Sequence, residues 1–315
     1  MFKFFQNLGR SLMLPVAVLP AGAIITGIGN LLNALHVLPT VAMFFSIVGT
    51  AILGQLGLIF AIGVAIGMAK KNDGAVALAG ALGYAMVTKV LNPENVATLF
   101  NIKEKAVNLG FTKMDNSNVF LGIIIGLIAA YSFNKFSEVE LPMALSFFSG
   151  KRLVPIMTVF FSTILAVILL FIWPMVFSGI VAFGEWLVGF GSFGAFLYGV
   201  FNRLLIPTGL HHALNAVFWF DTAGINDIGK FQTGVDAVKG ITGRYQAGFF
   251  PIMMFGIPAA ALAMYHSAET KQQKQIWGWF LASAISAFVV GVTEPIEFAF
   301  MFVAPVLFII HALLT

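Results

Sequence analysis

The stretch 291–298 reads Gly291-Val292-Thr293-Glu294-Pro295-Ile296-Glu297-Phe298, and it places helix breakers and two carboxylates inside a long apolar run. A second block, Pro207-Thr208-Gly209-Leu210-His211-His212-Ala213-Leu214-Asn215, interrupts another apolar run in the same way. In a bilayer, broken helices and titratable side chains persist only where they line a cavity or meet a partner. The two blocks therefore predict a polar site inside the membrane, built on re-entrant or broken helices.

The rest of the chain has the composition of a membrane protein. Of its 315 residues, 59% are hydrophobic and 10% are charged, and the mean hydropathy is +0.96. Apolar runs extend to the last residue, so we expect no separate water-soluble domain. We predict an all-α polytopic membrane protein with about ten transmembrane helices. The candidate spans are 12–34, 41–69, 74–91, 119–133, 153–175, 177–200, 247–265, 276–292 and 298–314.

Several functional classes are excluded by what the chain lacks. It contains no cysteine, which rules out disulfides, thiolate metal sites and a phosphocysteine within this chain. It contains no G-x-x-x-x-G-K-[ST] motif, so it binds no ATP through a P-loop, and it has no H-x-x-x-H zinc pattern. The net charge of +4 comes from basic residues at span ends rather than from a nucleic-acid patch. We expect no cofactor, no metal and no nucleic-acid partner.

Basic residues at the ends of the spans predict which ends face the cytoplasm. The positions expected inside are Lys70-Lys71, Lys135, Lys151-Arg152, Lys271 and Lys274. The short connection Leu35–Thr40, with His36 as its only titratable group, is expected outside. The segment 92–118 carries three lysines although the alternation of spans places it outside, so its side stays open.

The first polar block contains candidate binding residues. Pro207 and Gly209 interrupt the helix and free backbone groups that water or a ligand must satisfy. His211 and Asn215 are four residues apart and share one helix face, whereas His212 points elsewhere. A donor-rich face of this kind suits sugar hydroxyls. The candidate substrate-binding residues of this region are Arg203, His211, His212 and Asn215.

The second block contains two carboxylates with different expectations. Pro295 fits the first helical position, with Glu294 or Thr293 as the cap. Glu297 then falls in the first turn, where the helix dipole favours a carboxylate, so a plain capping role competes with substrate binding. Glu294 should face the break, where a carboxylate can accept a hydroxyl proton. Both carboxylates are candidate substrate-binding residues.

Three further features carry weaker signals. Lys151-Arg152 begins a span and serves either as a positive-inside anchor or in the approach of a phosphoryl group. Arg244 could bridge its loop to the site. The spacings Gly63-x-x-x-Gly67 and Gly122-x-x-x-Gly126 favour close helix packing, with a dimer interface and plain glycine abundance as competing explanations.

Four blocks in order resemble a known family. They are Leu8–Pro20, Gly150–Pro155, Gly209–His212 and Thr293–Phe298. Over nearly its whole length the chain resembles enzyme IIC, the membrane-embedded component of the bacterial phosphoenolpyruvate-dependent phosphotransferase system, in the glucose/glucoside superfamily. Two segments are most similar to N-acetylglucosamine-specific members, with glucose and maltose members close behind. These segments are Leu205–His212 with Phe218–Phe220, and Arg244–Pro251.

The resemblance implies sugar import coupled to phosphorylation, by a protein-Npi-phosphohistidine–sugar phosphotransferase of which this chain is the permease part. The sugar would bind from outside in a transport half, about residues 151–315, which carries it to the cytoplasmic side by rigid-body movement. There a phosphocysteine on a IIB domain would phosphorylate the 6-hydroxyl. His211 and Glu294 would be the catalytic pair, and Arg203 would order the pocket or offset phosphoryl charge. The N-terminal half, about residues 1–150, would form a homodimer scaffold in the bacterial inner membrane.

IIB and IIA domains are missing from this sequence, so the phosphate donor is expected either on another polypeptide or on a part removed from this one, and whether IIB is fused or separate stays open. The last residues, His311–Thr315, stop within an apolar run, and a C-terminal truncation is one expectation. Two alternative functions remain open. One is a glucose- or maltose-specific IIC subunit, and the other is an ion-coupled secondary sugar transporter, which also uses broken helices near the bilayer midplane.

Overall fold

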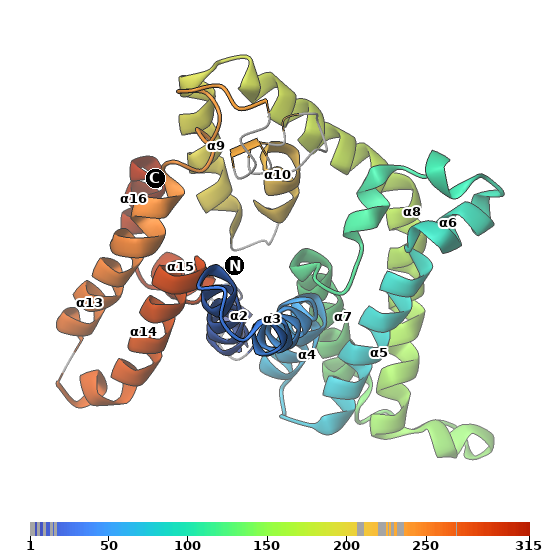
Figure 1. Cartoon of the computed structure of the whole chain (residues 1–315). Helices are drawn as coiled ribbons and strands as arrows, with labels where there is room; N and C mark the ends of the chain where they lie inside the picture. The colour runs from blue at the N-terminus through green and yellow to red at the C-terminus, as the bar shows by residue number, and fades with distance from the viewer. Residues whose placement is uncertain are drawn as a thin grey trace. The chain divides into compact units, whose positions relative to one another are not determined.

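The computed structural model describes residues 18–206, 211–219, 236–268 and 270–315, together with residues 4, 7, 8, 11, 12, 15, 225, 227, 230 and 231. Within these residues every regular element is helical and no β-strand occurs, as Figure 1 shows. The predicted all-α class is therefore confirmed. The Pro207–Leu210 break itself lies outside the described residues.

The chain divides by packing into two compact units. One comprises Met1–Val16 and Gly54–Ser178, and the other comprises Ala17–Leu53 and Gly179–Thr315. The predicted halves, with a boundary near residue 150, concerned scaffold and transport roles. Packing does not test those roles, so they stay a prediction.

The first unit contains five of the described helices, and two of them approach one another closely through glycines. A side-chain carbon at Gly122 would collide with the backbone of Gly57, and one at Gly126 would lie 2.8 Å from the carbonyl oxygen of Ala61. The predicted close packing at Gly122-x-x-x-Gly126 is confirmed, and it lies between α4 and α7 of one chain. The helices are α4 (Leu56–Met68), α5 (Gly74–Val90), α6 (Pro93–Phe100), α7 (Val119–Phe136) and most of α8 (Leu153–Val188).

Different hydrogen bonds stabilise the two ends of this unit. At one end, the Asn134 side chain accepts the Lys70 backbone N–H at 2.6 Å and donates to the Met68 carbonyl at 3.1 Å. At the other end, the Tyr84 hydroxyl donates to the carbonyl oxygens of Asp115 and Asn118 at 2.9 and 3.0 Å. Because α5 and α7 run between these ends, the segment 92–118 lies opposite the Lys70-Lys71 end. The side of the membrane on which segment 92–118 lies stays open.

The second unit gathers its core around aromatic rings. Tyr198, Phe218 and Tyr245 are buried, with ring centroids 4.3 Å apart for the first pair and 4.7 Å for the second. Its helices are α2 (Leu19–Ala34), α3 (Pro39–Leu53), the end of α8, α9 (Ser192–Leu205), α10 (His211–Phe218), α12 (Phe249–Pro251), the π-helical turn η6 (Ile252–Gly256), α13 (Ile257–Ser267), α14 (Thr270–Val290), α15 (Glu294–Val303) and α16 (Pro305–Leu314).

Four predicted spans differ from the helices of the structure in their limits or their continuity. The predicted span 41–69 consists of two helices, α3 and α4, which are interrupted around Gly54 and together have the length and composition of one broken span. The predicted boundary near residue 176 does not exist, because α8 continues through Pro174 and the chain turns only near Gly191, whose φ is +59°. The predicted span 298–314 is divided at Ala304, because the residue before Pro305 is pushed out of helical geometry to φ −140°, ψ 68°.

Membrane-crossing length is reached by a few of the described helices. Three are long and apolar enough to cross a bilayer, namely Val119–Phe136, Gly150–Val188 and Phe249–Ser267. The number rises to five if each of two bent helix pairs counts as one span. These helices give the chain the apolar character of a membrane protein.

Candidate functional site

A buried ion pair joins α9 to α15 in the second unit. Nη1 of Arg203 donates to Oε1 of Glu297 at 2.8 Å, and the two side chains are 2% and 0% exposed. The same nitrogen donates to the Thr293 hydroxyl at 3.1 Å, and that hydroxyl donates to Oε2 of Glu297 at 3.0 Å. The guanidinium also lies over the Phe249 ring, 4.6 Å from its centroid. Arg203 is therefore fixed by charge, hydrogen bonds and an aromatic face.

A third residue, which was not predicted from the sequence, contacts the carboxylate of this ion pair. Nε2 of His311, on α16, lies 3.0 Å from Oε1 of Glu297. Glu297 lies in the first turn of α15, as the capping interpretation expected, and both of its oxygens also contact side-chain donors. A lone histidine in the apolar run 305–314 gave no local signal of this contact.

Glu294 and His211 form a second, more accessible pair. Nε2 of His211 lies 3.6 Å from Oε1 of Glu294, and 21% of the Glu294 side chain is exposed. Helix α15 begins at Glu294 after Thr293 and carries Pro295 in its first turn, as the sequence predicted. One turn of α15 thus supplies an accessible carboxylate and a buried one.

Asn215 is buried where α10 meets α9, and its predicted role in substrate binding stays a prediction. Its Oδ1 accepts the Tyr198 hydroxyl at 2.7 Å and the Asn202 side-chain amide at 2.6 Å. Asn215 and His211 are both buried, but these hydrogen bonds of Asn215 join α10 to α9 rather than to α15. The side chain of His212 lies outside the described residues, so its predicted role stays a prediction.

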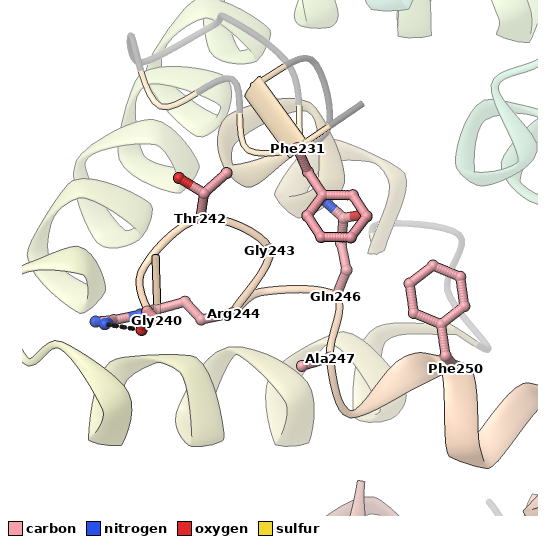
Figure 2. Close-up of a pocket in the computed structure, with 8 residues that line it drawn as sticks. All are labelled: Phe231, Gly240, Thr242, Gly243, Arg244, Gln246, Ala247 and Phe250. Carbon is pink, nitrogen blue, oxygen red and sulfur yellow. Dashed lines mark hydrogen bonds between the residues drawn. The ribbon is translucent and has the colours of Figure 1, made fainter. Parts of the chain in front are cut away.

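A separate cavity of about 330 Å³ lies on the loop before α12. Figure 2 shows the Phe231 ring beside Gln246, with Phe250 on the neighbouring helix. Arg244, which the sequence predicted to bridge toward the site, donates through Nη2 to the carbonyl of Gly240 at 3.0 Å (Figure 2). This hydrogen bond of Arg244 therefore lies within its own loop. The lining residues are Phe231, Gly240, Thr242, Gly243, Arg244, Gln246, Ala247 and Phe250.

The buried carboxylate of Asp227 binds the loop that lines this cavity. Oδ1 of Asp227 accepts the Gly243 N–H at 2.8 Å, and Oδ2 lies 3.4 Å from the Gln246 amide nitrogen. Gly243 has a φ of +88°, a conformation that glycine adopts without strain. Within the described residues, no group of three or more His, Cys, Asp or Glu side chains could hold a metal ion.

Comparison with known proteins shows which family the sequence matches. The model of the family described as "Phosphotransferase system, EIIC" matches residues 9–315. The N-acetylglucosamine-specific EIICB component of Bacillus subtilis (strain 168) is 45% identical over 100% of this chain and 65% of its own length. The N-acetylglucosamine-specific EIICBA component of Escherichia coli (strain K12) is 45% identical over 99% of this chain and 45% of its own length. The chain thus spans about half to two thirds of these two relatives.

A third relative covers a larger share of its own length. The N-acetylglucosamine-specific EIIC component of Streptomyces coelicolor is 43% identical over 100% of this chain and 77% of its own length. A glucose-specific EIICBA component from Staphylococcus saprophyticus is 40% identical over 100% of this chain and 50% of its own length.

Proposed function

We propose a specific transport role for this chain, which belongs to the EIIC family of the phosphotransferase system. It is a sugar-translocating IIC subunit that imports N-acetylglucosamine. Three relatives at 43 to 45% identity carry this specificity in their names, whereas the glucose-specific relative is 40% identical. The resemblance of segments 205–212 and 244–251 points to the same sugar. A glucose- or maltose-specific subunit is the alternative.

The observation that carries the proposal is the His211–Glu294 pair beside the Arg203–Glu297 pair. Glu294 is the more accessible of the two carboxylates, so we assign it the acceptance of the proton from the sugar 6-hydroxyl. His211, at 3.6 Å, orients that carboxylate or the sugar. In the described part of the chain, Nε and Nη2 of Arg203 have no hydrogen-bond partner. They are suited to bind sugar oxygens or to offset phosphoryl charge.

A phosphocysteine donor must lie outside residues 1–315, because this sequence contains no cysteine. We propose a IIB domain carrying phosphocysteine, in line with the EIICB and EIICBA names of the relatives. The hydroxyl oxygen forms a bond to phosphorus as the sulfur–phosphorus bond breaks, and the hydroxyl proton passes to Glu294. The whole assembly is then a sugar phosphotransferase, and this chain is its permease.

We further propose a multi-pass arrangement in the bacterial inner membrane. The Lys70-Lys71 end of the first unit faces the cytoplasm, as the positive-inside bias favours, and segment 92–118 faces outside. About ten spans require several shorter or broken helices to cross, and apolar helices such as 276–289 and 305–314 are candidates. Ile156, Phe160 and Ile164, 47, 55 and 46% exposed, form a stripe on α8 that suits lipid. A homodimer through residues 1–150 is part of the proposal on the resemblance alone.

The proposal is tested in proteoliposomes containing the purified chain, radiolabelled N-acetylglucosamine and a phosphorylated IIB domain. Sugar 6-phosphate should form only with the phosphorylated IIB domain, and Glu294→Gln should abolish it. Glu185→Gln, which changes an exposed carboxylate of α8, is the matched control and should retain activity. Accumulation of unmodified sugar driven by a proton or sodium gradient would instead establish a secondary transporter.

A further inference from the structure

His311 stands on a helix that the predicted site did not include. Its ring contacts those of Phe300 and Phe308, with centroids 5.7 and 6.0 Å away, and its side chain is 10% exposed. Its Nε2 approaches Oε1 of Glu297 to 3.0 Å. An ionised carboxylate only accepts hydrogen bonds, so Nε2 carries the proton in this contact.

The donors around Glu297 occupy both of its oxygens. Oε1 accepts from Arg203 and His311, and Oε2 accepts from Thr293. The carboxylate is 0% exposed, so no water competes for it. Glu297 is therefore a fixed acceptor, and its orientation sets which nitrogen of Arg203 it engages.

We propose that His311 is a positioning residue for the sugar site and acts through Glu297; this inference rests on the proposed sugar-binding function. By occupying Oε1 together with Nη1 of Arg203, His311 holds the carboxylate in a one-nitrogen contact with the guanidinium. Without His311, the carboxylate rotates into the two-pronged contact that carboxylates and guanidinium groups favour. That contact takes up a further N–H of Arg203, which in the present geometry is left for the sugar.

The test compares substitutions at His311 in the full purified chain, read as the equilibrium Kd for radiolabelled N-acetylglucosamine. His311→Leu keeps an apolar side chain against the phenylalanines but removes the donor, and it should weaken binding by ~10-fold or more, since a hydrogen bond to a charged group is involved. His311→Gln supplies an amide N–H in place of Nε2 and should restore most of the affinity. His266→Leu, at an exposed histidine of α13, is the matched control and should leave the Kd unchanged.

A double-mutant cycle separates this role from plain packing. If His311 acts through Glu297, adding His311→Leu to Glu297→Gln should change the Kd no further, because neighbouring residues of one network are not additive. Losses that multiply, or a Gln variant as weak as the Leu variant, would overturn the inference. If the wild type binds glucose or maltose instead, the proposed sugar fails and the same comparisons on the bound sugar still decide the role of His311. Wild-type protein that binds none of the three sugars would overturn both proposals.

Discussion

Arg203 and Glu297 are 94 residues apart in sequence, and they form an ion pair in which both side chains are buried. Removing two charges from water carries a desolvation penalty that their attraction offsets only with good geometry and further hydrogen bonds. Thr293 and His311 supply those bonds. Such a pair specifies one arrangement of α9, α15 and α16 more than it adds to stability.

This balance predicts unequal effects of single and double substitutions. Glu297→Leu leaves a buried guanidinium unpaired and should destabilise the protein by ~3–5 kcal/mol, whereas Arg203→Met combined with Glu297→Leu should recover most of that loss. The Tm of each purified variant measures this. Lys71→Ala, at the exposed pair with Glu138, is the control and should leave the Tm nearly unchanged. A double variant as unstable as Glu297→Leu would show that the buried charge is not what destabilises it.

The contact of α4 with α7 predicts opposite outcomes for two helical glycines. Gly122→Ala forces a side-chain carbon against the Gly57 backbone and should destabilise by ~1–3 kcal/mol. Gly179→Ala, on α8, meets nothing within 4 Å and should be neutral or slightly stabilising, because alanine favours helix. Thermal unfolding of the two variants measures the difference. Equal Tm values would refute the close approach.

The bonds to Asn215 predict a structural contribution from that residue. Asn215→Leu leaves the Tyr198 hydroxyl and the Asn202 amide without their buried acceptor and should destabilise by ~1–3 kcal/mol. Tyr198→Phe removes one donor and leaves the acceptor bonded to Asn202, so its effect should be smaller. Denaturation of both variants ranks them, and the reverse order would contradict this network.

The ion pair of Asp73 with Lys151 predicts a pH dependence of stability. The Lys151 ammonium, followed by the Ala75 N–H, holds the pKa of Asp73 below its ordinary value of 3.8. A carboxyl whose folded pKa is depressed stabilises the fold above its unfolded pKa, and this stabilisation is lost as pH falls through the folded value. The Tm difference between wild type and Asp73→Asn should therefore shrink as the pH is lowered from neutrality past 3.8. A difference that is constant with pH would mean that Asp73 acts without its charge.

The sequence predicted the site residues that carry a local signal. Glu294 and Glu297 stand out because carboxylates beside Pro295 are unusual in an apolar run, and Arg203 stands out for the same reason. His311 has no such neighbours, since only the packing of α16 against α15 brings it to Glu297. Tertiary contacts of this kind cannot be predicted from the local sequence pattern.

The limits of the helices also depend partly on local sequence signals and partly on tertiary packing. Ala304 breaks its helix because Pro305 follows, a rule that sequence supplies. The continuity of α8 through Pro174 could not be predicted, because in an apolar setting one lost backbone hydrogen bond is tolerated and neighbouring groups compensate. The break around Gly54 also depends on packing, since no proline marks it.

Equilibrium binding of radiolabelled N-acetylglucosamine to the purified chain tests the central proposal most directly, with glucose and maltose as competitors and His211→Ala beside the wild type. The account predicts saturable binding to the wild type, poor displacement by glucose and maltose, and loss of binding in His211→Ala. Full binding by His211→Ala would contradict the assigned site, and tighter binding of glucose or maltose would contradict the assigned sugar.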